Sequence, residues 1–290
     1  MATLSDIKRR ISSVQSTQKI TSAMKMVSAA KLRRAQDAIE SARPYAERMR
    51  ATLHEVGAGE VGTSHPLLEA REEVSNVELV VISSDRGLAG AFNSQIVKEV
   101  ELLTEGWDAE GLTVHFTVVG KKAGEYFRRH RGGQISDDRP IGPAVNYLEA
   151  QQIAQRLMAR YQSGEVDRVL ILHNEFVSAM TQTPKRVPLL PFVPETAAVE
   201  DDSDKEPYEI EPNAEKLLAT LVPKAVEVEV FRSLLENQAG EHAARMTAME
   251  NATKNTEELI DRLTLQFNRA RQAAITSELV EIITGAQALS

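Results

Sequence analysis

The stretch AVEVEVFRSLLENQAGEHAARMTAMENATK, residues 225–254, belongs to a segment in which nothing forces the backbone out of an α-helix. From Lys224 to Thr284 there is no proline and only one glycine, Gly240. We expect one helix of roughly 70 residues, about 100 Å long, from about Pro212 to the end. Apolar side chains recur along it at helical spacing: Val228, Phe231, Leu235, Met246, Met249, Leu259, Leu263, Phe267, Ala270, Ala274, Leu279, Ile282, Ile283 and Ala286. Because one helix cannot bury its own apolar side, something must lie alongside it.

The amino-terminal segment has a similar pattern, since no glycine precedes Gly57 and its only proline is Pro44. Thr3 followed by Asp6 predicts a capping box at the start of a helix of roughly 50 residues, bent near Pro44. The apolar stripe begins as a heptad and then becomes irregular, which argues against a regular zipper: Leu4, Ile7, Ile11, Val14, Ile20, Met24, Val27, Leu32, Ala35 and Ile39.

Between these helices, strands alternate with helices, which predicts an open, mostly parallel sheet. The expected strands are Val77–Ser83, Thr113–Val119 and Arg168–His173, and the expected helices are Asn93–Leu103, Lys121–His130 and Ala144–Tyr161. Pro184–Pro194 carries four prolines and is at most an extended edge segment, and the acidic Glu195–Glu211 predicts a surface loop or short hairpin.

The fold class is therefore α/β, with a long antiparallel coiled coil of amino- and carboxy-terminal helices flanking a central Rossmann-like open α/β domain. The expected ranges are 1–57 for the first helix, 58–211 for the α/β domain and 212–290 for the second helix. The second helix is longer by roughly 20 residues, so about 30 Å of it should extend past the pair. An unpaired apolar tip needs a socket in another protein.

Composition excludes several classes of function. The chain has no cysteine, which excludes disulfides, thiolate metal sites and cysteine nucleophiles. The net charge is −8, yet residues 1–50 carry about seven more basic than acidic side chains, which indicates either a solvated helix face or a surface for an anionic partner. Nucleic acid is the weakest candidate for that partner, because no aromatic side chains interleave with the charges.

No catalytic, cofactor or metal site can be assembled from the motifs. The turn with Gly87 and Gly90 follows the first strand, where a doubly wound sheet binds nucleotides, but it lacks the three-glycine fingerprint. The six histidines show no pairing typical of metal ligands, and no nucleophile elbow is present. We expect a structural turn and a non-catalytic chain.

Four motifs make the chain resemble one family over its whole length. ITSELVEIITGAQA (275–288) matches the carboxy-terminal signature of the gamma subunit of the F-type ATP synthase. The likeness extends to the other motifs, which are IKRRI (7–11) with QKITSAMKMV (18–27), SDRGL (84–88), and AARM (243–246) with ARQ (270–272).

The resemblance implies a rotor shaft without catalytic residues. In that family the helix pair stands inside a ring of three alpha and three beta subunits, and the α/β domain sits with the epsilon subunit on the membrane c-ring. Proton flow turns the ring and the shaft, one copy per complex, and drives rotary ATP synthesis. By motif match, the implied partner-contact residues are Met24, Lys25, Arg245, Arg271, Gln272, Thr276, Glu278, Leu279, Ile282 and Ile283.

The resemblance also implies a location, the cytoplasmic face of a bacterial cell membrane, because no transit peptide is visible. Two other functions compete with the rotor. A static coiled-coil adaptor would dock a multi-subunit partner by its tip without turning, and a nucleotide-binding enzyme would use the turn at Gly87.

Overall fold

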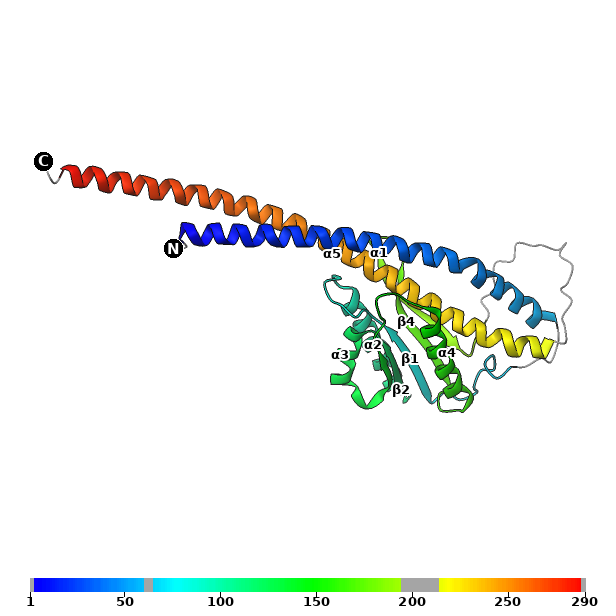
Figure 1. Cartoon of the computed structure of the whole chain (residues 1–290). Helices are drawn as coiled ribbons and strands as arrows, with labels where there is room; N and C mark the ends of the chain where they lie inside the picture. Colours follow the sequence, from blue (N-terminus) through cyan, green and yellow to red (C-terminus); the bar gives the residue numbers. More distant parts are fainter. Residues whose placement is uncertain (1–2, 60–64, 194–213, 288–290) are drawn as a thin grey trace. The chain divides into compact units, whose positions relative to one another are not determined.

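The computed structural model describes residues 3–59, 65–193 and 214–287. The first and last of its elements are the two expected long helices, α1 (Leu4–Gly59) and α5 (Ala214–Gln287), which are labelled in Figure 1. By internal contacts the chain forms two compact units, residues 1–28 with 245–290 and residues 29–244. We refer to them as the helix-pair unit and the sheet unit. The three expected domains (1–57, 58–211 and 212–290) were bounded by the ends of the long helices, whereas these two units are defined by internal contacts. The three-domain division stays a prediction.

The sheet unit contains a five-stranded sheet in the order β3-β2-β1-β4-β5. The strands are β1 (Asn76–Ile82), β2 (Thr113–Val119), β3 (Ile135–Arg139), β4 (Arg168–Phe176) and β5 (Gln182–Leu190). The first four are parallel, and β5 runs antiparallel to β4. The expected strands are confirmed as β1, β2 and β4, and the proline-rich segment forms the edge, where missing N–H donors cost least.

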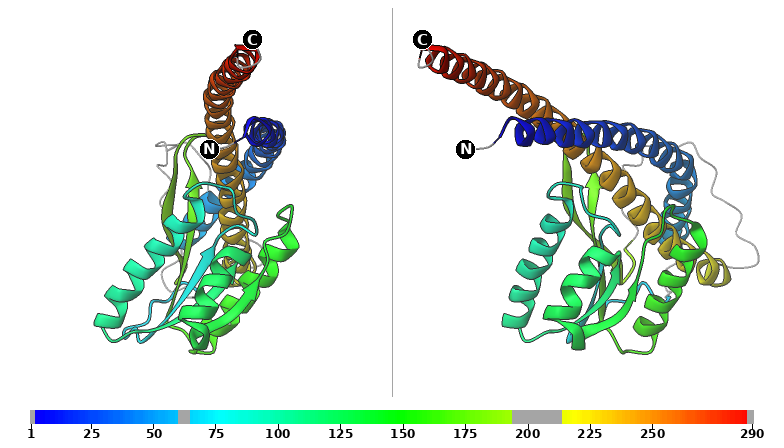
Figure 2. Two further views of the ribbon diagram at one scale, coloured as in Figure 1. Left: turned by 90° about the vertical axis from the view of Figure 1, so that its left-hand side faces the viewer. Right: turned by 60° about the vertical axis from the view of Figure 1, so that its left-hand side comes forward.

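Three α-helices connect the strands, and helices lie on both faces of the sheet (Figure 2). They are α2 (Phe92–Ala109), α3 (Lys121–His130) and α4 (Tyr147–Gln162), with a short 3-10 turn η1 (Gly132–Gln134) before β3. Side chains alternate along β1, so Leu79 and Val81 pack with α2 and α3, whereas Val80 and Ile82 pack with α4 and α5. The covering of both faces explains why these strands are apolar throughout.

The structure differs from the sequence expectations in three places. β3 was not expected, because its sequence ISDDR has no apolar run. α4 begins at Tyr147 rather than Ala144, since the Asn146 side chain caps it by accepting the Glu149 N–H at 2.9 Å. α2 continues to Ala109, beyond the expected Leu103. The expectation for residues 195–211 lies outside the described residues.

α1 and α5 pack together within the sheet unit as well. Met49 and Leu53 of α1 share one buried cluster with Leu218 and Val222 of α5, the pairing expected of antiparallel helices. α1 stays helical through Pro44 and curves along this stretch (Figure 2), as proline inside a helix predicts. At its other end the predicted capping box is confirmed, because the Asp6 N–H and the Thr3 N–H donate to the Thr3 hydroxyl and the Asp6 carboxylate.

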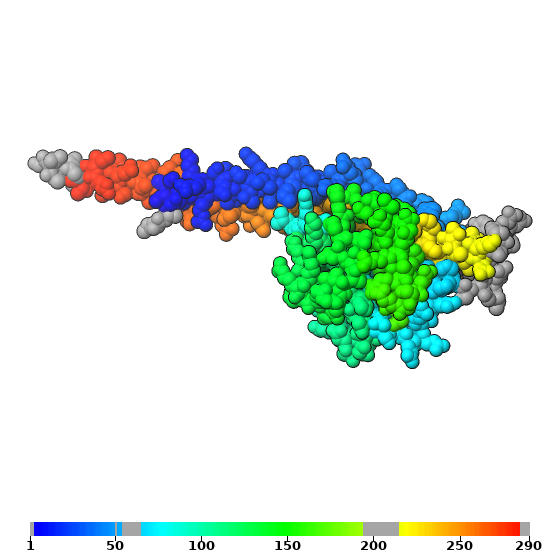
Figure 3. Space-filling view, turned by 60° about the horizontal axis from the view of Figure 1, so that its bottom comes forward, coloured from blue at the N-terminus to red at the C-terminus, as the bar shows by residue number. Residues whose placement is uncertain are grey.

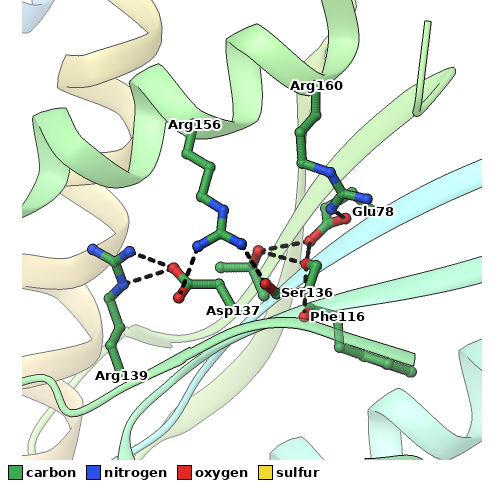
Figure 4. Close-up of polar contacts among 8 residues, drawn as sticks. Glu78, Phe116, Ser136, Asp137, Arg139, Arg156 and Arg160 are labelled. Carbon is green, nitrogen blue, oxygen red and sulfur yellow. Dashed lines mark hydrogen bonds and ion pairs between the residues drawn. The ribbon is translucent and has the colours of Figure 1, made fainter. Parts of the chain in front are cut away.

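The face of the sheet under α4 holds a buried charge, Glu78, which is fully shielded from solvent (Figure 4). Its carboxylate accepts hydrogen bonds from Thr117 Oγ1 at 2.6 Å and Ser136 Oγ at 2.5 Å, and it pairs with Arg160 of α4. Beside it, Asp137 of β3 pairs with Arg139 and with Arg156 of α4. β3 is therefore held to α4 by ion pairs, which explains how so polar a segment forms a strand.

Replacing Arg160 with Met should destabilise the sheet unit by about 3 kcal/mol or more, because Glu78 would remain buried without its counter-charge. Guanidinium unfolding of the full chain followed by fluorescence of Trp107, the only tryptophan, measures this, since Trp107 packs against the α2 side of the core. The matched control is Arg168→Met at the exposed start of β4. Equal losses in the two variants would contradict the assignment.

Candidate functional site

The helix-pair unit carries all ten sequence-predicted partner contacts. Within it, α1 and α5 run antiparallel, with Thr21 Oγ1 2.8 Å from Thr253 Oγ1 and Lys25 Nζ 3.1 Å from Glu250 Oε1. Carrying this register along the helices places Leu4 level with about residue 271. The last residues of α5 therefore extend past the start of α1 by about 24 Å at 1.5 Å per residue. The red end of the chain in Figure 3 lies beyond the blue start of α1.

The buried side of α1 repeats every seven residues, which the apolar stripe did not reveal. Ile7, Thr21, Ser28 and Ala35 are buried and Val14 is half-buried. The expected stripe is wrong at Ile20 and Val27, which are 60% and 57% exposed. A heptad is thus present, but two of its positions hold small hydroxyl residues that bring the helices close and bury little apolar surface.

Because the buried side of α1 contains Thr21 and Ser28, some apolar side chains of α1 face solvent instead. Ile20, Met26 and Val27 on α1 form an exposed group in which Met26 is 65% exposed. Sequence reasoning missed this group, because it placed Ile20 and Val27 in the buried stripe. Ile20 and Val27 lie seven residues apart on one side of the helix, and exposed apolar side chains on one helix face are typical of a protein–protein contact.

The basic character expected of the first helix is exposed on the described part of α1. Residues 4–28 carry Lys8, Arg9, Arg10, Lys19 and Lys25 against Asp6 alone. Lys25 pairs with Glu250, and a hydrogen bond from its amine lowers the pKa of that carboxyl. Both side chains are about two-fifths exposed, at 41% and 39%, so a partner could reach and compete for them.

Residues 272–284 at the tip of α5 are exposed, except for the half-buried Ala274. Its large apolar side chains lie between 49% and 68% exposed, and they are Ile275, Leu279, Val280, Ile282 and Ile283. The predicted contacts Arg271, Gln272, Thr276 and Glu278 are also exposed. The structure thus brings seven predicted residues into one terminal segment of α5.

The two predicted contacts Met24 and Arg245 are less accessible. Met24 is half-buried on α1, and Arg245 is only 9% exposed and already engaged in interactions. Arg245 would have to leave these interactions before it could bind a partner.

The turn at residues 84–88 is tied down by its own side chains. Asp85 accepts backbone N–H groups of Lys121 at 2.9 Å and Ile141 at 3.2 Å, and Ser84 is bonded to Asn93. Beside it, at the carboxyl ends of β1 and β4, lies Asn237 of α5, whose Nδ2 donates to the Ser83 carbonyl at 3.1 Å. The place where a doubly wound sheet receives a nucleotide is thus filled by the chain itself.

The described residues offer neither a metal site nor a membrane-spanning helix. Among residues 3–59, 65–193 and 214–287, no group of three or more metal-ligating side chains is placed to hold an ion. In the same part of the chain, no helix is long and apolar enough to cross a membrane.

Comparisons with known proteins agree over the full length. The family model described as ATP synthase matches residues 3–289. The ATP synthase gamma chain of Desulforamulus reducens is 48% identical over 290 residues, with both chains fully covered.

Two solved structures are also similar. A chain from the central stalk and c-ring structure of Tetrahymena thermophila mitochondrial ATP synthase is 27% identical at a TM-score of 0.60, covering 80% of this chain and 99% of that one. A chain from a Euglena gracilis mitochondrial ATP synthase structure of OSCP, F1 and c-ring has a TM-score of 0.64 at 20% identity. It covers 99% of this chain and 94% of that one, and it supports the fold of two long packed helices flanking an α/β domain.

The geometry predicts uneven hydrogen exchange along α5 in the isolated chain. Amides of residues 272–284 should exchange much faster than those of residues 222–243, because the former have no neighbouring element in the described structure and the latter are mostly buried. Exchange measured by mass spectrometry on peptides from the two ranges tests this. Equal protection would mean that something covers the tip, and size-exclusion chromatography would then reveal self-association.

Proposed function

This chain belongs to the ATP synthase gamma chain family, and on that premise we propose that it is the shaft that carries torque from a proton-driven c-ring to the catalytic beta subunits. As a gamma chain it is a non-catalytic subunit, the central-stalk rotor of an F-type ATP synthase complex. Rotation of this shaft inside a ring of alpha and beta subunits would push each catalytic site in turn through binding, formation and release of ATP.

The observation that carries the proposal is the exposed tip of α5. About 16 residues extend past α1, and the large apolar side chains described among them are exposed, including Leu279, Ile282 and Ile283. Apolar contacts have no preferred direction, so a sleeve formed by alpha and beta subunits could hold this tip without fixing its angle. A static adaptor would instead be expected to present one directional docking face.

The helix pair has no internal symmetry, which suits one copy per complex. Its Ile20, Met26 and Val27 group lies on α1 alone, so three chemically identical partners around it would each meet a different face. Such a shaft can place three identical beta subunits in three different states.

The contacts implied by the family motifs divide into three groups. We propose that Met24 and Lys25 meet acidic loops of the beta subunits. Arg245 of α5 lies about five residues from their level in the register of the two helices and would contact a partner once it leaves its present interactions. Arg271, Gln272, Thr276 and Glu278 would meet surrounding loops, and Leu279, Ile282 and Ile283 would run in the sleeve.

We propose the remaining partners from the subunits that accompany similar chains in solved structures. The Tetrahymena structure contains the central stalk with the c-ring, and the Euglena structure contains F1, OSCP and the c-ring. We propose that the sheet unit of this chain sits with an epsilon subunit on a c-ring, at the cytoplasmic face of a bacterial cell membrane. No nucleic acid takes part.

The test of the proposed function is assembly. The purified chain mixed with its own alpha and beta subunits should give one copy per three alpha and three beta by native mass spectrometry, with ATP hydrolysis that depends on it. Several copies per ring, or no assembly, would leave the adaptor function instead.

Replacing Met24 with Arg should lower coupling more than assembly, because a new cation would meet acidic loops and hold them too strongly. ATP-driven proton pumping per ATP hydrolysed, measured in vesicles that contain the whole complex, should fall by about threefold or more. The control is Met180→Arg in the turn between β4 and β5, where Met180 is 85% exposed. Unchanged coupling in the Met24 variant would show that Met24 does not lie at such a contact.

A further inference from the structure

The side chain of Asn237 on α5 enters the sheet where β1 and β4 stop pairing. The last paired residues of these strands are Val81 and Leu172. Just beyond them, Asn237 Nδ2 donates to the Ser83 carbonyl at 3.1 Å, and Asn237 Oδ1 accepts the Asn174 N–H at 3.4 Å. Ser83, Asn174 and Asn237 are all fully buried. The side-chain amide of Asn237 offers a donor and an acceptor, so it satisfies two backbone groups from different parts of the sheet at once.

Contacts on either side of Asn237 fix the same turn of the helix. Glu236 is bonded to His173 Nε2 of β4 at 3.1 Å and to Arg232 Nε at 2.9 Å. Burial acts to raise the pKa of Glu236, but the hydrogen bonds from His173 and Arg232 outweigh it and lower that pKa to about 2. Glu236 therefore stays charged at neutral pH and keeps its bond to β4.

Gly240 lies about one turn after Asn237, and its lack of a side chain allows α5 to approach Phe92 of α2 and Asn174 of β4 closely. A Cβ atom at this position would come 3.1 Å from Phe92 Cε2 and 3.4 Å from the Asn174 carbonyl oxygen. Asn174 in turn donates from its side chain to the Phe92 carbonyl at 3.1 Å, so β4, the start of α2 and α5 meet at one point. A glycine inside a helix costs roughly 1 kcal/mol relative to alanine, which fits a position selected for proximity.

Turning a helix about its axis requires contacts that resist rotation. Apolar contacts such as those of Val230 and Leu234 with the sheet are non-directional and permit slippage. Hydrogen bonds depend on angle and resist it. Asn237 makes two such bonds in a fully buried position about two turns before Ala244, where the sheet unit ends.

We propose that Asn237 is the positioning residue that locks the rotational angle of α5 to the sheet, so that torque passes from the sheet unit into α5 at this point. The proposal rests on the rotor function above and adds the residue that joins the sheet to the shaft. Asn237 touches no substrate and acts through the angle of α5.

The test uses the complete ATP synthase complex in vesicles. Asn237→Leu keeps the branching and the number of heavy atoms of the side chain but removes both hydrogen bonds. Leu234→Ala is the matched control, since it weakens the same interface without touching a directional bond. The ratio of ATP-driven proton pumping to ATP hydrolysis should fall by about threefold or more in Asn237→Leu and stay near the native value in Leu234→Ala. Equal ratios in the two variants would overturn the proposal.

The Gly240→Ala variant provides a second test of the proposal if the Asn237→Leu variant fails to assemble into the complex. Its methyl group would press on Phe92 and shift α5 by a fraction of an ångström, which should lower the pumping ratio partly, and adding Phe92→Leu should restore it. A native ratio in Gly240→Ala would overturn the proposal in that case.

The two proposals fail in different ways. If the complex with the native chain neither assembles nor hydrolyses ATP in a chain-dependent manner, the rotor function itself is wrong. If the native complex pumps protons and the Asn237 variant pumps equally well per ATP, only the assignment of Asn237 is wrong.

Discussion

A helix of 74 residues has more apolar surface than it can bury alone, and the rest of the molecule is arranged by what covers each part of α5. Residues from Leu218 to Leu234 share a buried cluster with α4, with β1, β4 and β5, and with the end of α1. Near Glu250 and Thr253 the contacts within the described chain are with α1. At Leu279 and Ile283 the described chain supplies no neighbour. Burial thus declines along one continuous helix, and the part with no cover within the chain is the part that must find it in a partner.

The sequence predicted best those elements whose side chains alone decide the structure. β1, β2 and β4 are continuous apolar runs covered on both faces, so their existence follows from composition. β3 could not be found in this way, because Asp137 becomes compatible with a strand only when Arg139 and Arg156 neutralise it. The buried side of α1 was misplaced for a related reason, since Thr21 and Ser28 look exposed in sequence, yet the near approach of α5 buries both.

The sequence predicted the candidate site only at the tip of α5, where the exposure of the side chains follows from the greater length of the second helix. The tip of α5 was expected because the second helix is longer than the first, and its residues are indeed exposed. Asn237 carried no signal in the sequence, because its role depends on two backbone groups more than 60 residues away in β4 and at the end of β1. Contacts with other subunits, such as those proposed for Met24 and Arg245, depend on surfaces that this chain does not contain.

Buried polar groups recur in the sheet unit where helices pack against strands or against each other, and their hydrogen-bond geometry explains why they are retained. Glu78 joins β1 to α4, Glu227 accepts from Tyr147 of α4 at 2.7 Å, and Asn237 joins α5 to β1 and β4. Apolar replacements of such groups often give equal or greater stability, so stability alone does not account for them. What a buried hydrogen bond adds is a single allowed register, because any slip leaves a donor or acceptor unsatisfied. In an open α/β sheet the crevice at the carboxyl edge receives a ligand, which must be able to leave. In this protein the same edge of the sheet is occupied by Asn237 of α5. In our proposal, the hydrogen-bonding groups that would bind a ligand in other α/β proteins hold α5 at one rotational angle here.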